Sequence, residues 1–102
     1  MLQIKPNCEC CDIDLEPDST QAMICSFECT FCASCVKQIL DNVCPNCGGG
    51  FVARPIRPHN EWRTGVSLTQ RPPSSERVHT PYSEQELRAF AAKVRHIEPA
   101  QR

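Results

Sequence analysis

The apolar residues of the first half of the chain lie in short clusters separated by polar turns, which predicts short elements. Residues 22–24 (Ala-Met-Ile) are a strand candidate and residues 27–31 a plausible return strand, so together they predict a small β-hairpin. Residues 51–53 (Phe-Val-Ala) predict a final strand. From residue 33 to about 41 the chain is predicted to be helical, because its apolar positions follow helical spacing at Val36, Ile39, Leu40 and Val43.

A second, amphipathic helix is predicted within residues 83–97. Ser83 at the N-cap and Glu86 three residues later form the pattern of a capping box. One face carries Leu87, Phe90, Ala91 and Val94. A helix of about fourteen residues is marginal alone in water. Its apolar stripe therefore requires a surface, on its own domain, on a partner or on a second copy.

Residues 59–82 contain few apolar residues and include Arg-Pro-Pro-Ser-Ser-Glu-Arg, so we expect a linker that is partly extended or disordered. Trp62, Val66 and Leu68 are the exceptions and are expected to dock on the domain, with Trp62 as a packing anchor. The predicted organisation is a domain at 1–58, a linker at 59–82 and a helix at 83–97.

Nine cysteines change this picture, because a core of this size is only marginally stable without disulfides or bound metal ions. Eight of them form pairs at knuckle spacing: Cys8/Cys11, Cys25/Cys29, Cys32/Cys35 and Cys44/Cys47. Four such pairs predict two structural four-thiolate sites, each holding one Zn²⁺. The expected fold class is a small zinc-stabilised α+β domain with a hairpin and one helix, followed by an extended tail and a C-terminal helix.

Disulfides are the alternative use of these cysteines, and the compartment decides between the two. The first seven residues lack the apolar run of a signal peptide, and no stretch approaches the ~20 apolar residues of a membrane span. We therefore expect a cytoplasmic protein with reduced thiols, metal ligation in place of disulfides, and no membrane partner.

The cysteine spacing resembles the RING finger family in an all-cysteine variant. Phe31 directly before Cys32, a helix after Cys35 and the final Cys-Pro-Asn-Cys also match that family. The resemblance implies a cross-brace in which the first and third pairs bind one ion and the second and fourth pairs bind the other. Site one would then contain Cys8, Cys11, Cys32 and Cys35, and site two Cys25, Cys29, Cys44 and Cys47.

Other arrangements stay open at this point. Without a cross-brace, Cys25, Cys29, Cys32 and Cys35 would share one ion, although the short loops between them make that hard to achieve. Cys-Pro-Asn-Cys-Gly also resembles a rubredoxin knuckle, which would hold iron, and thiolates alone do not exclude iron. The ninth cysteine, Cys10, is interpreted as a spectator, with a reactive thiol as the alternative. The histidines are interpreted as surface residues: His59, His79 and His96.

Three longer motifs resemble the small bacterial proteins grouped as domain of unknown function 1272. They are Asn-Cys-Glu-Cys-Cys-Asp at 7–12, Ile-Cys-Ser-Phe-Glu-Cys-Thr-Phe-Cys at 24–32 and Cys-Pro-Asn-Cys-Gly-Gly-Gly-Phe at 44–51. The resemblance covers residues 1 to about 58. It implies a bacterial cytosolic protein and carries no established activity.

The charge is divided unevenly between the halves. Residues 1–50 carry two cations and seven anions, whereas residues 51–102 carry nine cations and five anions. The acidic half is a poor candidate for nucleic acid, which is bound through lysine and arginine. Both charged surfaces are interpreted as solvated; the alternatives are that the basic tail folds back on the acidic half or that it meets an acidic partner.

No catalytic set is visible, and closed four-ligand sites leave no open position for chemistry. We therefore expect a non-enzymatic, zinc-binding protein-interaction or regulatory module with an unidentified protein partner. The first alternative is a ubiquitin-ligase-like RING adaptor, although Asp12 after Cys11 and Gly48 after Cys47 depart from that pattern. The others are a thiol-based redox or zinc sensor, and a nucleic-acid-binding protein that uses tail arginines: Arg54, Arg57, Arg63, Arg71 and Arg77.

Overall fold

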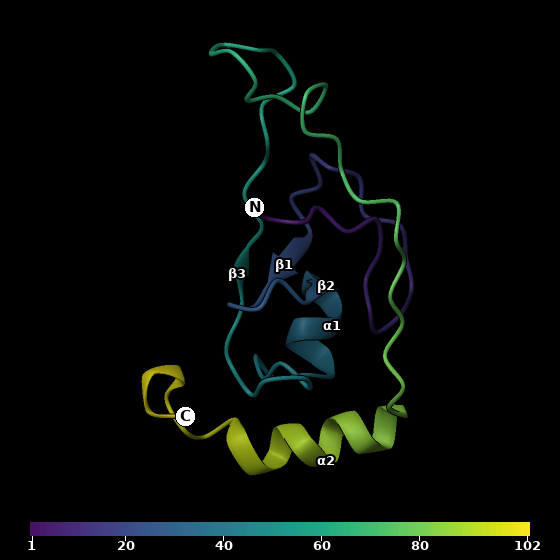
Figure 1. Ribbon diagram of the computed structural model, residues 1–102. Coiled ribbons are helices and arrows are strands. Elements are labelled where there is room, and N and C mark those ends of the chain that lie inside the picture. Colours follow the sequence, from purple (N-terminus) through teal and green to yellow (C-terminus); the bar gives the residue numbers. More distant parts are fainter.

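A three-stranded antiparallel sheet lies at the centre of the computed structural model, which describes residues 1–102 (Figure 1). The strands, in the order β2-β1-β3, are β1 (Ala22–Ile24), β2 (Thr30–Cys32) and β3 (Val52–Ala53). Met23 is paired with Phe31 on one side and with Ala53 on the other. The hairpin is confirmed, but its return strand begins later than residue 27, because Glu28 turns the chain with a left-handed φ of 67°.

Helix α1 (Ala33–Gln38) follows β2 without a linker. Of the predicted apolar face only Val36 lies within the helix, whereas Leu40 and Val43, which are also buried, follow its end. The helix ends before residue 41, the predicted end, because Asp41 and Asn42 adopt left-handed φ values of 48° and 59°. This bend lets the Asn42 side chain accept a hydrogen bond from the Phe51 amide at 2.9 Å, which ties the helix end to the segment before β3.

Phe31 and Phe51 meet edge to face in the core, with ring centroids 5.3 Å apart and an interplanar angle of 73°. The same core cluster contains the buried residues Leu15, Leu40 and Leu87 and several cysteines. Only 23 of 102 residues are buried, so apolar packing alone is a weak basis for the fold. The cysteines therefore occupy positions where a metal would add the missing stabilisation.

Residues 72–80, which we call the strap, run in extended form along the N-terminal loop (Figure 1). The Ser74 amide donates to the Ile4 carbonyl at 3.0 Å and the Thr80 amide to the Glu9 carbonyl at 2.7 Å. The side-chain amide of fully buried Asn7 donates to the Val78 carbonyl at 2.8 Å. The strap is thus bound to the cysteine-rich half by hydrogen bonds along most of its length.

Charge complementarity reinforces this contact. Arg77 of the strap pairs with Asp12 at 2.9 Å and with Asp14 at 2.6 Å. Further along, Arg95 lies 3.4 Å from Asp41, and Arg102 donates to the Asn42 carbonyl at 2.8 Å. The basic second half therefore folds back on the acidic first half, which was one of the alternatives to two solvated surfaces.

Helix α2 (Glu84–Val94) lies at one end of the molecule and is followed by the short 3₁₀ helix η1 (Pro99–Gln101) (Figure 1). The Ser83–Glu86 capping box is present as predicted. Leu87 is 3% exposed and Ala91 is buried, whereas Phe90 on the same face remains 37% exposed. Part of the apolar stripe therefore packs on the protein's own domain.

Shortening Leu87 should release α2 while the sheet stays folded. Leu87→Ala removes buried side-chain volume from the contact with the core and should cost about 2–5 kcal/mol. Hydrogen exchange measured by mass spectrometry should show faster exchange in α2 and unchanged protection of β1. Phe90→Ala is the matched control on the same helix, and equal acceleration in both variants would mean that Leu87 does not anchor the helix.

Residues 58–71, which we call the tip loop, protrude at the end of the molecule opposite α2 (Figure 1). The loop closes on itself through a 2.8 Å hydrogen bond from the Leu68 amide to the Pro58 carbonyl. Trp62 is 76% exposed and Val66 is also exposed, so the prediction that they dock on the domain is wrong. The extended Arg-Pro-Ile-Arg-Pro exit holds the loop away from the core, because proline fixes the backbone.

Candidate metal centres

Four cysteines from three parts of the chain meet at site one: Cys8 and Cys11 on the N-terminal loop, Cys32 at the end of β2, and Cys35 in α1. Their sulfur atoms all lie within 4.8 Å of one another. The Sγ atoms of Cys11 and Cys32 are 3.8 Å apart. A zinc–sulfur tetrahedron with bonds of ~2.3 Å has edges of about 3.8 Å, so this spacing fits a metal ion.

Backbone amides point at the sulfurs of site one. The Cys11 amide donates to Cys8 Sγ at 3.5 Å, and the Cys35 amide donates to Cys32 Sγ at 3.4 Å. The second bond also makes Cys32 the N-cap of α1. Hydrogen bonds of this kind favour the thiolate over the thiol, which is the form that binds metal.

Site two brings together Cys25, directly after β1, with Cys44 and Cys47 on the knuckle that follows α1, again within 4.8 Å. The amides of Phe27 and Gly49 donate to Cys25 Sγ at 3.3 Å and to Cys47 Sγ at 3.4 Å. Gly48 has a φ of 80°, a left-handed conformation that glycine adopts readily, in the turn after Cys47. The two groups are interleaved along the chain, in the order that the RING resemblance implies.

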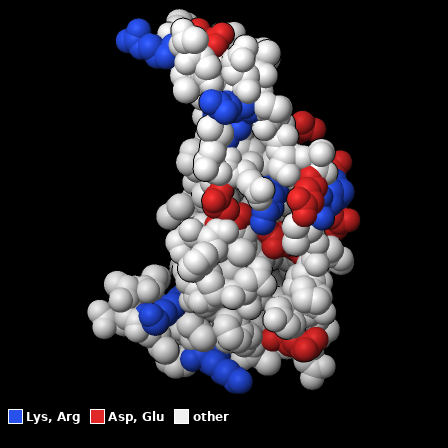
Figure 2. Space-filling model, viewed as in Figure 1, with Lys and Arg blue, Asp and Glu red and all other residues white.

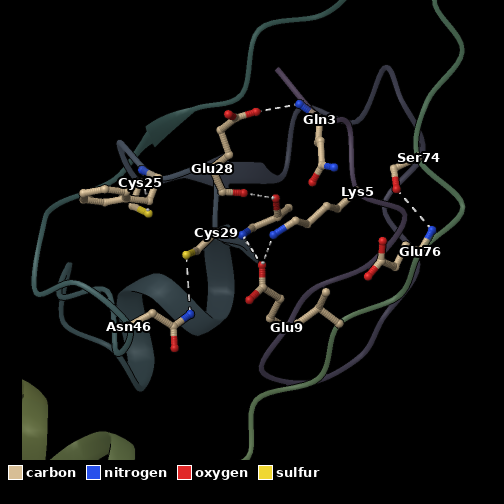
Figure 3. A network of polar contacts seen from close by, with 12 residues as sticks. Gln3, Lys5, Glu9, Cys25, Glu28, Cys29, Asn46, Ser74 and Glu76 are labelled. Atoms are coloured by element: carbon tan, nitrogen blue, oxygen red, sulfur yellow. Dashed lines mark hydrogen bonds and ion pairs between the residues drawn. The ribbon is translucent and has the colours of Figure 1, made fainter. Parts of the chain in front are cut away.

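Cys29 is the predicted ligand that the structure does not bring into site two. Its sulfur instead accepts a hydrogen bond from the Asn46 side chain at 3.4 Å (Figure 3). Cys29 nevertheless follows Cys25 through one tight turn, in which the Cys25 amide donates to the Cys29 carbonyl at 3.2 Å. The structure therefore supplies three grouped thiols at this site, with a fourth close by along the chain.

A cysteine grouped at site two and the neighbouring Cys29 should respond differently to serine substitution. Cys44→Ser removes a buried, grouped thiol and should abolish binding of the second ion. Cys29→Ser leaves the three grouped thiols in place and should weaken binding of the second ion by about 10–100-fold without abolishing it. Competition with a chromophoric chelator measures both affinities. An unchanged affinity in the Cys29→Ser protein would exclude Cys29 from the metal site.

Burial controls the protonation of these thiols in the metal-free chain. It raises the pKa of Cys8 to about 11 and also raises the pKa values of Cys35 and Cys44. Burial acts in the same direction on exposed Cys11, but hydrogen bonds from Ile13 and the neighbouring cysteines outweigh it and lower its pKa. At neutral pH, Cys8, Cys35 and Cys44 must therefore lose a proton when a metal binds.

Metal affinity should consequently increase with pH. A thiol whose pKa lies above the working pH releases one proton on binding, which changes the affinity by up to about tenfold per pH unit for each proton released. Acid should thus release the ions, and mild alkali should tighten their binding. Chelator competition at a series of pH values tests this, and an affinity independent of pH would show that the thiols are already ionised before binding.

Sequence reasoning missed Glu9, whose carboxylate is buried beside the first residue of β2. The Thr30 amide donates to its Oε2 at 2.6 Å, and Lys5 lies 3.3 Å from the same atom (Figure 3). The Glu9 amide also donates to the Thr30 carbonyl at 2.9 Å, so Glu9 fastens the loop of site one to β2. The motif Cys-Glu-Cys-Cys gives no signal of this burial, because Lys5 and Thr30 are recognised as partners only after folding.

The other candidate ligands lie outside both groups. Cys10 is half-buried and packs against the core cluster, and all nine cysteines are free. His79 lies on the strap 3.2 Å from the Cys10 carbonyl, whereas His59 and His96 are exposed. None of the three histidines joins a metal-ligand group.

The fold and its cysteine groups define a small α+β protein built around two clusters suited to metal ions. The chain belongs to the family described as Protein of unknown function (DUF1272), whose model matches residues 1–57. An uncharacterised protein of Rhizobium meliloti (strain 1021) is 54% identical over 81 residues, which cover 79% of this chain and 89% of that protein. No solved structure matches the chain. The predicted membership of this family is thereby confirmed.

Proposed function

We propose that this protein is a non-catalytic protein-interaction or regulatory module, held together by two structural zinc ions in a RING-like cross-brace. The observation that carries the proposal is that two groups of thiols, interleaved along the chain, occur in a protein whose apolar core is small. Thiolate ligands suit zinc, and four thiolates close the coordination sphere of a structural site. Site two reaches four ligands when Cys29 turns its sulfur from Asn46 toward the group.

The role of the metals is therefore structural. Cys8, Cys11, Cys32 and Cys35 would hold one ion, and Cys25, Cys29, Cys44 and Cys47 the other. Zinc bound in this way joins distant segments of the chain and contributes directly to folding. The bacterial, cytoplasmic setting that we propose is supported by the relative from Rhizobium meliloti and suits reduced thiols. No helix of the structure is both long and apolar enough to cross a bilayer.

Two of the five tail arginines are unavailable to a nucleic acid. Arg54 is buried and donates to the Lys5 carbonyl at 2.8 Å and the Glu16 carbonyl at 3.0 Å. Arg77 is paired with Asp12 and Asp14. These two guanidinium groups stabilise the fold and are not available to phosphates.

A ligase-like adaptor role is supported by the interleaved cysteine groups and by exposed Ile13 near the first knuckle. Two features weaken it. Pro45 of the last knuckle is buried and lines a hollow together with α2, so it offers little surface to a conjugating enzyme. Gly48 occupies the position where a RING ligase carries a basic residue. A discharge assay with a loaded conjugating enzyme tests this alternative, and the proposal predicts no stimulation.

The test of the proposed function is affinity purification of the tagged, metal-loaded protein from its native cells under thiol-protecting conditions. The proposal predicts a stoichiometric protein partner that is absent when the bait is Cys8→Ser/Cys11→Ser. Nucleic acid in place of protein, bound in a steeply salt-dependent manner, would contradict the proposal. Reversible zinc release by mild peroxide, with a rate altered by Cys10→Ser, would instead favour the sensor alternative.

A further inference from the structure

The tip loop combines exposed apolar side chains with a defined hollow. Trp62 is the only tryptophan of the chain, and it lies on this loop with exposed Val66. The hollow beside them has a volume of about 370 Å³ and is lined by Met1, Pro58, Trp62 and Val66, and by arginines. This volume falls in the ~300–1,000 Å³ range of ligand sites. Trp62 and Val66 thus place apolar side chains beside this hollow on an otherwise polar tail.

The arginines of this hollow carry charge that no carboxylate neutralises. Arg57, Arg63 and Arg71 line it, and none of them takes part in an ion pair of the structure. The carboxylate of Glu61, the acidic residue on the loop, accepts the Gly65 amide at 2.6 Å. In Figure 2, basic side chains are visible at the protruding end of the molecule, together with an acidic side chain.

Arg57 is held in place before any ligand arrives. Its guanidinium donates to the Arg71 carbonyl at 2.5 Å and to the Leu2 carbonyl at 2.7 Å. Carbonyl partners fix the side chain but leave its positive charge in place. A second hollow of about 430 Å³, lined by Leu2 and Gln70 among others, shares Met1, Arg57 and Arg71 with the first. The fixed cation thus lies between two neighbouring hollows.

We propose that the tip loop docks an acidic protein segment that carries an apolar side chain. This inference rests on the proposed function and names the surface and the chemistry of the partner. The apolar residue occupies the hollow beside Trp62, and carboxylates pair with Arg63 and Arg71. Aromatic and arginine side chains are the residues that contribute most to protein interfaces.

A peptide fits this surface better than a nucleic acid or a membrane. The loop offers one aromatic platform, whereas single-stranded nucleic acid is usually bound by several aromatic side chains in succession. The acidic residues of the cysteine-rich half would also repel a long polyanion that extends past the tip. A short acidic segment can place its charge on the tip alone.

The test is a titration of the zinc-loaded full chain with synthetic peptides, in which the intrinsic fluorescence of Trp62 reports binding. The probes are short aspartate- and glutamate-rich peptides, each with one central apolar residue. This residue is Leu, Ile, Phe or a non-fluorescent analogue of Trp, so that the peptide does not contribute to the fluorescence. Lysine-rich versions of the same peptides, an oligothymidylate and phosphatidylglycerol vesicles are run in parallel. We expect a saturable fluorescence shift with an acidic peptide and a weaker response to the other probes.

Variants assign this binding to the tip loop. Arg63→Glu/Arg71→Glu should weaken binding by at least about tenfold, because two interface charges are reversed. Lys37→Glu/Lys93→Glu changes the net charge equally on exposed residues of α1 and α2 and should change affinity less than about twofold. Trp62→Ala, measured with a labelled peptide, should also lose at least about tenfold.

Tighter binding of oligothymidylate or vesicles, equal loss in both charge-reversal variants, or no response to any peptide would each overturn the inference. Metal content is measured on every sample. A protein that holds two zinc ions but ignores the peptides contradicts only the tip-loop inference, whereas a protein without the two ions contradicts the proposed function as well.

Discussion

Replacing both thiols of the first knuckle should leave the protein with one metal ion and without a stable fold. Cys8→Ser/Cys11→Ser removes two of the four grouped sulfurs of site one, one of them fully buried. Structural zinc contributes on the order of 10–16 kcal/mol in small zinc domains. Small domains have a total stability of only about 5–15 kcal/mol, so loss of one site is enough to unfold the chain.

Cys10→Ser is the matched control for this prediction, since the same substitution is made between the two ligands at a residue outside the group. It should keep two ions and a native circular dichroism spectrum. Metal analysis and circular dichroism of the three proteins give the result. A folded double variant would mean that apolar packing alone carries the fold, and an unfolded Cys10→Ser protein would place Cys10 in site one.

Truncating Phe31 should have the largest effect of any change outside the cysteines. Its side chain is fully buried and packs against Phe51 with ring centroids 5.3 Å apart. Phe31→Ala leaves a cavity in a small core, which should cost about 3–5 kcal/mol. The residue also directly precedes Cys32, so a loosened β2 should weaken metal binding at site one.

Phe27→Ala is the matched control, because Phe27 lies on the same hairpin but is 73% exposed. Its cost should stay within about 0.5 kcal/mol, as for an exposed position. Chemical denaturation of both variants at one fixed concentration of free zinc measures the difference. Similar losses of unfolding free energy in the two variants would contradict the description of the core.

Local patterns made several elements of this fold predictable. The i, i+3, i+4, i+7 spacing identified buried residues in α1 and just after it, and the capping box located the start of α2. Knuckle spacing identified the cysteines that lie together at site one, because two thiols two residues apart are held close by one turn of the chain. These predictions succeeded because they depend on residues that are neighbours in sequence.

The features that sequence reasoning missed depend on contacts between distant segments. Glu9 is buried because Thr30 and Lys5 surround its carboxylate, and Cys29 accepts a hydrogen bond from Asn46 of the last knuckle. Trp62 shows the opposite error, because it was predicted to pack on the domain and is exposed. An aromatic residue in a polar stretch predicts docking on the domain, but two prolines in the preceding exit direct the chain away from the core.

Native mass spectrometry of the full chain as purified tests the central claim most directly, because it counts and identifies the bound ions in one measurement. We expect two zinc ions per chain, one for each thiol group. A single ion per chain, or a red protein that carries iron, would contradict the account of two structural zinc sites.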